Sequence, residues 1–390
     1  MTKKSFIGLV CLVGLGCGDD AGSGGSGAGG VGGAGGVVGP PEVAACDGAT
    51  LFESPADTSE PGPWPVGVRS GVVDGLAVEI WYPAKRGSEI DAAKKKYDMR
   101  DWLPEAERAK IPDEAAPLQT CDCSADLPLD GEHGPYPVIF FVHGTAGFRA
   151  QSLELTRHWA SRGFVVVAAD HPGLYLNDIL APLCGGMAPA RDLTGDIAKL
   201  TAAVQAPAGD LSFLAGRIDA TRIGMSGHSA GGGAIEDQGN VARVLVPMAA
   251  GGTVAGTALE STLVLASQED KVVDYMATLS SFEASPTPRR LVGLSPAGHL
   301  AFSSLCAIQN AAGEDVVTIG DKYMVCGLQF AEALFDCDAT YLPDETGWAI
   351  TNEASTAAFE EVLHCRPERA AVFGALKAKY PGVAEVIEAP

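Results

Sequence analysis

Apolar residues are concentrated in eight short segments of the chain, and each segment is a candidate β-strand. Four of them are almost continuously apolar, which is typical of parallel strands buried on both faces. The segments cover residues 65–73, 76–83, 137–144, 164–172, 222–227, 242–250, 261–268 and 289–296. Helical patterns lie between them, for example at 152–163 and 193–204. This alternation predicts an α/β fold with a mostly parallel, eight-stranded sheet and helices on both faces.

Two regions interrupt this regular pattern. A short turn at Asp74 and Gly75 separates the first two candidate strands, which predicts an antiparallel hairpin at the edge of the sheet. Residues 86–134 then form a long, charged insertion, for which we expect a helical excursion held by Cys121 or Cys123. The pattern leaves open whether this insertion covers a site or only extends the rim.

The N-terminus has the pattern of an export signal. Two lysines precede an apolar run at 6–15, which is too short to span a bilayer. Small residues before Cys17 resemble a bacterial lipoprotein signal, so we expect a signal at 1–17, a lipid anchor on Cys17 and a location in the cell envelope. Ordinary secretion is the alternative.

Three further segments complete the predicted domain organisation. Residues 18–41 are almost all glycine, alanine and serine, which is typical of a flexible linker. Residues 42–390 then form one catalytic domain, and its last part, 303–390, is expected to be a helical extension.

The charge of the chain excludes one class of partner. There are 27 basic and 49 acidic residues, giving a net charge of −22, and 46% of the residues are hydrophobic. A surface of this charge repels nucleic acid and anionic membranes, so we expect no nucleic-acid partner.

The cysteines indicate an oxidising compartment. Beyond Cys11 and Cys17 the chain has eight cysteines, which favours up to four disulfides of undetermined pairing. We expect Cys121 and Cys123 to bond other partners because they are so close in sequence. Zinc ligation is the rival interpretation, but the spacing does not fit a zinc site, and we expect no metal.

The glycine-rich segment 222–234, RIGMSGHSAGGGA, carries the chemistry. Its glycines fit neither a dinucleotide fingerprint nor a phosphate-binding P-loop. They do fit G-x-S-x-G, as Gly227, His228, Ser229, Ala230 and Gly231, placed after a predicted strand and before residues that can open a helix. The pattern predicts a nucleophile elbow that exposes Ser229.

A serine nucleophile needs a histidine to accept its proton. In this arrangement the base follows the nucleophile and the acid in the chain, and His299 and His364 are the two histidines after Ser229. We favour His299, in the loop after the last predicted strand. His364 has the pattern of a helical residue with a packing or surface role.

The acid is expected after the strand at 261–268. There the chain offers Asp270, with Glu269 as the alternative, while Asp274 is expected to cap the next helix. The strand before it ends in Met248 and two alanines, and so offers no carboxylate.

Two backbone N–H groups should stabilise the oxyanion. One comes from Ala230, the residue after the nucleophile. For the other we choose Thr145, with Phe148 as the lesser candidate. His143 is expected to support this loop rather than to transfer a proton.

These motifs, together with FVHGTAGFRAQSLELTRHWASRGFVVVAADHPG, resemble the α/β-hydrolase superfamily. Over residues 62–302 the chain is similar to the branch of platelet-activating-factor acetylhydrolases, dienelactone-hydrolase-like proteins and cutinase-like polyester hydrolases. It departs from the acetylhydrolases in the place of its acid, which is more like that of cutinases. Ala230 departs from polyester hydrolases, which usually have methionine there, and Ser229 replaces the cysteine of true dienelactone hydrolases.

The resemblance and the residues together predict a serine hydrolase that cleaves carboxylic esters of small molecules or lipids without a cofactor. A lipase or phospholipase and a polyester hydrolase are alternatives within the enzymes. A non-catalytic surface protein, using the insertion for binding, is the alternative of another class.

Overall fold

The computed structural model describes residues 39–328 and 336–390. The predicted signal at 1–17, with Cys17, and nearly all of the predicted linker lie outside the described residues. Across the described ranges, no helix is both long and apolar enough to span a membrane.

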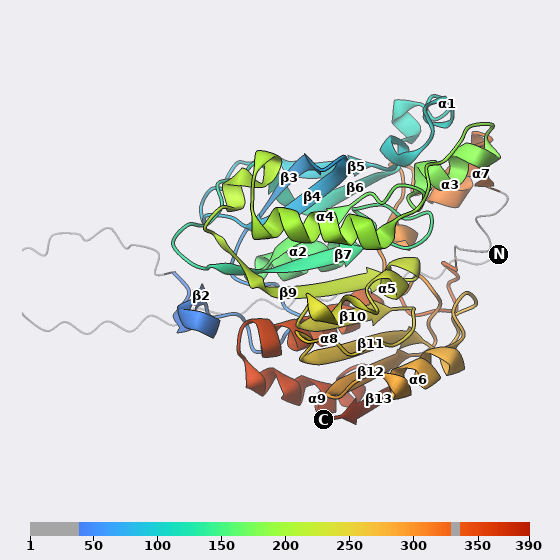
Figure 1. Cartoon of the computed structure of the whole chain (residues 1–390). Helices are drawn as coiled ribbons and strands as arrows, with labels where there is room; N and C mark the ends of the chain where they lie inside the picture. Colours follow the sequence, from blue (N-terminus) through green and yellow to red (C-terminus); the bar gives the residue numbers. More distant parts are fainter. Residues whose placement is uncertain (1–38, 329–335) are drawn as a thin grey trace, which may run out of the picture. The chain divides into compact units, whose positions relative to one another are not determined.

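An α/β sheet dominates the described residues (Figure 1). All eight predicted strands are present, as β3 (Val66–Val73), β4 (Leu76–Pro83), β7 (Tyr136–Val142), β8 (Val165–Ala169), β9 (Ile218–His228), β10 (Val244–Met248), β11 (Ser261–Ser267) and β12 (Arg289–Leu294). Their order in the sheet is β12-β11-β10-β9-β7-β8-β4-β3. The six strands from β12 to β8 are parallel to one another, while β4 is antiparallel to both β8 and β3. The predicted α/β-hydrolase fold is confirmed.

Three further strands extend this sheet to eleven within the described part of the chain. β5 (Lys94–Asp98) and β6 (Leu118–Ala125) come from the insertion 86–134, and β13 (Val383–Ala389) pairs antiparallel with β12. The expectation of a helical insertion was therefore only partly correct. The insertion contains the short helix α1 (Glu105–Arg108), but β5 and β6 lie on either side of it. The lysines of β5 face solvent on an edge strand and hide its strand pattern. The predicted β3–β4 hairpin is present. It does not lie at the edge of the sheet, however, because β6 pairs with β3 on its other side. The C-terminal extension is mostly helical, but it ends in a strand.

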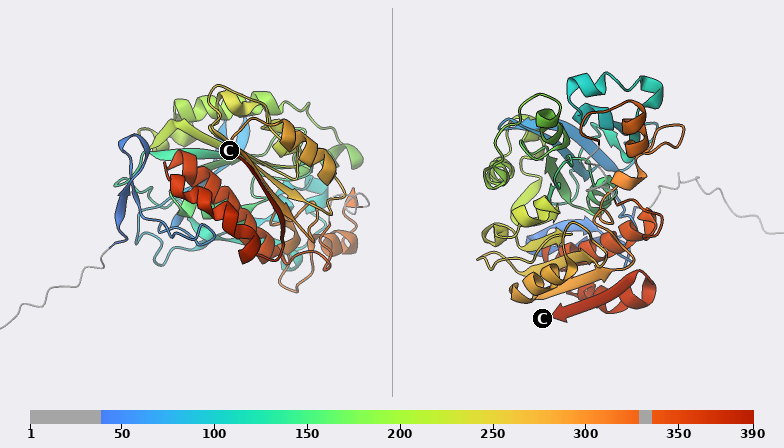
Figure 2. Two further views of the ribbon diagram at one scale, coloured as in Figure 1. Left: turned by 90° about the horizontal axis from the view of Figure 1, so that it is seen from below. Right: turned by 90° about the vertical axis from the view of Figure 1, so that its right-hand side faces the viewer.

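Helices cover both faces of the sheet, as predicted (Figure 2). α2 (Leu153–Ser161), α8 (Asp344–Leu363) and α9 (Ala371–Lys379) pack on one face, and α4 (Leu193–Gln205) and α6 (Tyr275–Ala284) on the other. Side chains alternate along each strand, so Phe141 packs in the cluster of Phe359 on α8, whereas Phe140 packs in the cluster of Ile197 on α4. Two small strands, β1 (Glu42–Ala44) and β2 (Thr50–Phe52), pair outside the main sheet.

Four disulfides join the eight cysteines outside the signal: Cys46–Cys365, Cys121–Cys123, Cys184–Cys326 and Cys306–Cys337. The expectation that Cys121 and Cys123 bond other partners was wrong. Both lie on β6, where residues two apart share a face of the strand, and their Cα atoms are 5.0 Å apart.

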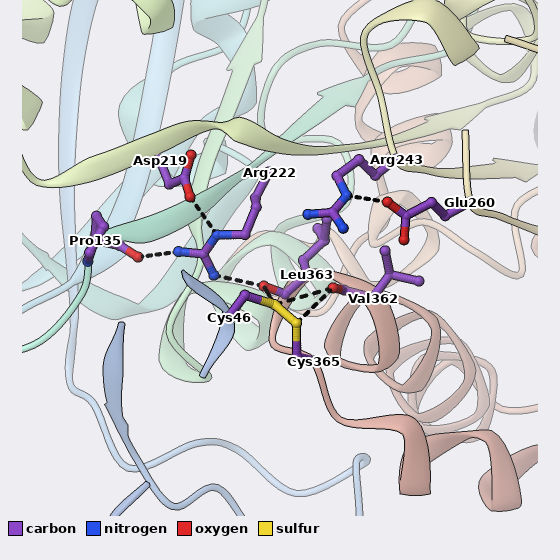
Figure 3. Close-up of a disulfide and its surroundings, with 9 residues drawn as sticks. All are labelled: Cys46, Pro135, Asp219, Arg222, Arg243, Glu260, Val362, Leu363 and Cys365. Carbon is purple, nitrogen blue, oxygen red and sulfur yellow. Dashed lines mark hydrogen bonds and ion pairs between the residues drawn. A yellow bond between two sulfur atoms is a disulfide. The ribbon is translucent and has the colours of Figure 1, made fainter. Parts of the chain in front are cut away.

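The Cys46–Cys365 bridge ties the N-terminal segment to the end of α8 (Figure 3). Beside it, the buried guanidinium of Arg222 donates to the carbonyl of Leu363 at 2.8 Å and to the carbonyl of Pro135 at 2.7 Å. Arg222 also pairs with Asp219. The beginning of β9, which carries the nucleophile at its other end, is thus fixed to two neighbouring segments.

A buried histidine predicts how stability depends on pH. His158 on α2 contacts the Thr58 carbonyl at 2.9 Å, and burial, with a smaller contribution from the charge of Arg162, lowers its pKa to about 3. In the unfolded chain an ordinary histidine pKa of about 6.5 applies, so below that pH the unfolded state binds a proton that the folded state does not. The stabilisation from neutral His158 is complete above pH 6.5 and is lost as the pH falls toward 3.

We expect His158→Gln, which keeps a hydrogen-bond donor but does not titrate, to flatten the acid loss of stability by up to about 1 kcal/mol per pH unit. Urea unfolding at pH 7, 6, 5 and 4.5 measures this slope. Parallel curves for the variant and the wild type would contradict the assignment.

Candidate active site

Four strands from the parallel part of the sheet bring the predicted site residues to one edge. Thr145 follows β7, Ser229 follows β9, Asp270 follows β11 and His299 follows β12. The carboxyl ends of these parallel strands meet at the same edge, which is where open α/β sheets bind ligands.

Ser229 lies in a sharp turn between β9 and α5 (Ala230–Ala234). Its backbone has φ 55° and ψ −120°, a strained conformation for a residue with a side chain. Glycine is required on both sides of it: a Cβ at Gly227 would collide with the backbone of Gly231, and a Cβ at Gly231 would collide with the carbonyl of Val142. The glycines thus allow segments of backbone to pass close to the serine.

Asp270 and His299 form a buried pair. The Nδ1 atom of His299 lies 2.8 Å from Asp270 Oδ2, and the side chains are 3% and 1% exposed respectively. The other carboxylate oxygen accepts the N–H groups of Val272 and Val273 at 2.7 and 2.8 Å. Burial alone would raise the pKa of Asp270, but the hydrogen bonds from His299 and these two N–H groups outweigh it, and the pKa lies below its ordinary value. Asp270 is thus an ionised acceptor that fixes the orientation of the imidazole.

Ser229 and His299 line one small cavity of about 30 Å³. The cavity is lined by Gly144, Thr145, Ala146, Gln151, His228, Ser229, His299, Leu300 and Leu305. Within the described residues, the backbone N–H groups of Thr145 and Ala230 have no hydrogen-bond acceptor. Both are therefore available to an oxyanion. Phe148, the lesser candidate, is not among the lining residues, and its ring stacks on Trp102.

The alternative catalytic residues have other contacts. Glu269 accepts a hydrogen bond from the Ser295 hydroxyl at 2.6 Å and one from the N–H of Ala297 at 2.8 Å. Asp274 caps α6, as predicted. His364 is buried, with its ring stacked on Phe164, so of the two roles open to it the structure shows packing rather than a surface position.

His143 supports the oxyanion loop, as predicted. Its Nδ1 contacts the carbonyl of Gly144 at 2.8 Å, and its Nε2 accepts the N–H of His171 at 3.1 Å. Burial, with a smaller contribution from His171, lowers its pKa to about 3, so the ring is neutral at neutral pH. In the described part of the chain, no group of three or more His, Cys, Asp or Glu side chains is arranged to hold a metal ion.

A buried relay that the sequence analysis missed connects three parts of the site. The N–H of Gly144 donates to Gln151 Oε1 at 3.1 Å, and Gln151 Nε2 lies 2.9 Å from His228 Nδ1. His228 Nε2 in turn lies 2.8 Å from the carbonyl of His299. Burial, then the nearby His299, lowers the pKa of His228 to about 3, so a neutral ring accepts from Gln151 and donates to His299. The relay therefore links the oxyanion loop, the elbow and the loop of the base.

We expect Gln151→Ala to reduce the free energy of unfolding by about 2–4 kcal/mol, because it leaves both the Gly144 N–H and His228 Nδ1 buried without a partner. Ester hydrolysis should fall about tenfold, since the relay positions the loops but supplies no group to the reaction. Urea unfolding and kcat measure the two effects. Gln238→Ala is the control, because among the described residues this half-buried side chain bonds only its neighbour Asp237, in an exposed contact. A loss in Gln151→Ala no larger than in this control would contradict the role of the relay.

Asp336 holds the loop of the base from the other side. Its carboxylate accepts the N–H groups of His299 and Leu300, the latter at 3.0 Å. Burial raises the pKa of Asp336 despite these two bonds. The adjacent Cys337 is bonded to Cys306, a few residues beyond His299, so the disulfide keeps this carboxylate beside the loop.

Comparison with known proteins adds a family to this geometry. Residues 61–173 match the family of platelet-activating factor acetylhydrolase, isoform II. Over these residues the chain is similar to that family of α/β hydrolases. The match confirms the predicted likeness to the platelet-activating-factor acetylhydrolase branch, and with it the prediction of a serine ester hydrolase. It covers the oxyanion loop but ends before Ser229, so the triad rests on the geometry above.

Among solved structures, the chain is similar to a ferulic acid esterase from Streptomyces cinnamoneus. The two share 16% sequence identity, with a TM-score of 0.49, and the similarity covers 78% of this chain and 92% of the esterase. Comparison with curated protein sequences gives no match.

Proposed function

We propose that this hydrolase cleaves carboxylic esters through an acyl-enzyme on Ser229, with His299 as the acid and base and Asp270 as the residue that orients it. The observation that carries the proposal is the meeting of Ser229, on its strained turn, with the buried Asp270–His299 pair at one cavity. A serine, an imidazole and a carboxylate in these roles are the requirements for acyl transfer.

The chemistry follows from the position of each group. Ser229 Oγ attacks the ester carbonyl carbon while His299 takes its proton, and the N–H groups of Thr145 and Ala230 stabilise the oxyanion. The C–O bond to the alcohol then breaks, and His299 returns the proton to the departing oxygen. Water attacks the acyl-enzyme by the same steps, releasing the carboxylic acid and restoring the free serine.

Lipid esters are the second candidate class of substrate. The acetylhydrolase family that matches residues 61–173 supports this candidate, because its name describes removal of an acetyl group from platelet-activating factor. Hydrolysis of a short-chain phospholipid, compared with that of a p-nitrophenyl ester, separates a phospholipase from a general esterase.

A fluorophosphonate probe tests the proposal. Such a probe reacts covalently with a serine only when a base activates it. We expect one probe per folded chain, and peptide mapping should find it on Ser229. No labelling of the folded protein, or labelling at another residue, would overturn the proposed function.

We also propose that the chain is exported and anchored by a lipid on Cys17. The lipoprotein-like signal supports this, as do the four disulfides, because disulfides persist in oxidising compartments outside the cytosol. In bacterial cells, labelled palmitate should enter the wild type but not Cys17→Ala. Equal labelling of the two proteins, or no labelling of either, would contradict the lipid anchor on Cys17 and favour ordinary secretion.

A further inference from the structure

A second, almost wholly apolar cavity lies beside the catalytic one. Its volume is about 120 Å³, and it is enclosed by three segments that are far apart in the sequence. The insertion contributes Leu103 and Ile111, α3 (Leu176–Leu183) contributes Leu180, and α7 (Val316–Lys322) contributes Val316 and Ile319. The elements α1 (Glu105–Arg108), α3 and α7 gather at the same end of the sheet in Figure 1.

One charged side chain, Arg100, also borders this cavity. Its guanidinium is occupied by the carboxylates of Asp98 and Asp113 and by the carbonyl of Ile111. It therefore offers no free charge to a ligand, and the chemistry of the cavity is that of a hydrocarbon site.

Ala146 connects this cavity to the catalytic one, because it lines both. It follows Thr145, the proposed oxyanion donor, and its N–H donates to the carbonyl of Leu174 just before α3. The N–H of Leu176 donates in turn to Gly147, so α3 is fixed to the oxyanion loop. Ala146 is therefore the point at which the two cavities adjoin.

The alcohol and the acyl group of an ester can be distinguished by where each lies relative to His299. His299 must protonate the departing alcohol, so the alcohol lies on its side of the catalytic cavity. Leu300 and Leu305, from the loop of the base, line the catalytic cavity but not the apolar one. The apolar cavity adjoins the oxyanion loop instead, away from the side of the alcohol, so it is the acyl group that can reach it.

The walls of the cavity are fixed before any ligand arrives. The Cys184–Cys326 disulfide joins the end of α3 to the segment after α7. Trp102 of the insertion donates to Asp170 at 2.9 Å and stacks on Phe148, with 4.2 Å between ring centroids. The insertion also reaches the segment after α7, where Glu107 accepts the N–H of Cys326 at 2.6 Å. Preorganised walls reduce the entropy lost on binding.

We propose that this cavity is the acyl-chain site of the enzyme, and that it selects linear aliphatic acyl groups of about four to eight carbons, since a dry apolar cavity of about 150 Å³ accommodates benzene. The inference rests on the proposed ester hydrolysis. It also assigns the insertion 86–134 a role, as part of the wall that determines substrate length.

Hydrolysis of p-nitrophenyl acetate, butyrate, hexanoate, octanoate and palmitate tests the proposal. For the wild type we expect kcat/KM to rise about fourfold per added methylene as far as hexanoate, from about 0.8 kcal/mol for each buried CH₂, and then to fall by palmitate. Ile179→Trp, which fills the cavity from α3, should lower kcat/KM for hexanoate at least tenfold and leave acetate within about twofold. Val317→Phe fills it from α7 and should act in the same way.

Met187→Trp is the matched control, because that side chain is 92% exposed and does not line the cavity. No gain in wild-type kcat/KM from acetate to hexanoate would overturn the proposal, as would an equal loss on all esters in both filling variants. It would also fail if the filling variants discriminated among acetate esters of longer alcohols instead. Failure of the proposed function has a different signature, since the wild type would then neither hydrolyse any ester nor react with the fluorophosphonate.

Discussion

Ser229→Ala is expected to lower kcat for p-nitrophenyl butyrate by roughly 10⁵- to 10⁶-fold, because no other group can form the acyl-enzyme once the hydroxyl is removed. The fold should be unaffected. Ser229 is half-buried, alanine fits wherever serine fits, and the strain at φ 55° is present in both residues. The variant should therefore unfold at nearly the same urea concentration as the wild type.

Ser226→Ala is the matched control for this variant. Ser226 lies three residues earlier, on β9, is buried and donates to the carbonyl of Val246 at 3.1 Å. Its removal should cost about 1 kcal/mol of stability and leave kcat within about threefold. Activity in Ser229→Ala comparable with that of this control would remove the nucleophile from the proposed mechanism.

The central strands could be predicted from the sequence because both of their faces are buried. β8 and β11 are buried along their full lengths, so hydrophobicity alone identifies them. The three strands that were not predicted, β5, β6 and β13, carry no such signal. In β5 only Tyr97 is buried. Its hydroxyl donates to Glu79 at 3.0 Å, a contact that depends on the fold rather than on the local sequence.

The candidate site was predictable in part, for a related reason. Ser229, Asp270 and His299 follow strands in a fixed order, so chain position and residue type were sufficient to nominate them. Gln151 and Asp336 have no such signature. Gln151 meets His228 across 77 positions of the sequence, and Asp336 reaches His299 across 37, so only the folded chain identifies them.

Asp270→Asn is expected to lower kcat by about 10³- to 10⁴-fold with little change in the geometry around it. The ionised carboxylate accepts the Nδ1–H of His299 and so leaves Nε2 free to take the serine proton. An asparagine can present its NH₂ group to Nδ1 instead, which stabilises the wrong tautomer and removes the charge that compensates the imidazolium. Measuring kcat together with the fluorophosphonate labelling rate checks this, and both should fall.

Two nearby carboxylates provide the controls for Asp270→Asn. Asp274→Asn keeps an N-cap on α6, since asparagine caps as well as aspartate, and kcat should stay within about twofold. Glu269→Gln tests the alternative acid, which contacts Ser295 and the N–H of Ala297 rather than the imidazole, so its effect should be smaller than tenfold. A larger loss in Glu269→Gln than in Asp270→Asn would transfer the role of the acid to Glu269. The 2.8 Å contact between Asp270 and His299 predicts the larger loss of kcat in Asp270→Asn, because only a carboxylate that contacts the ring can select its tautomer.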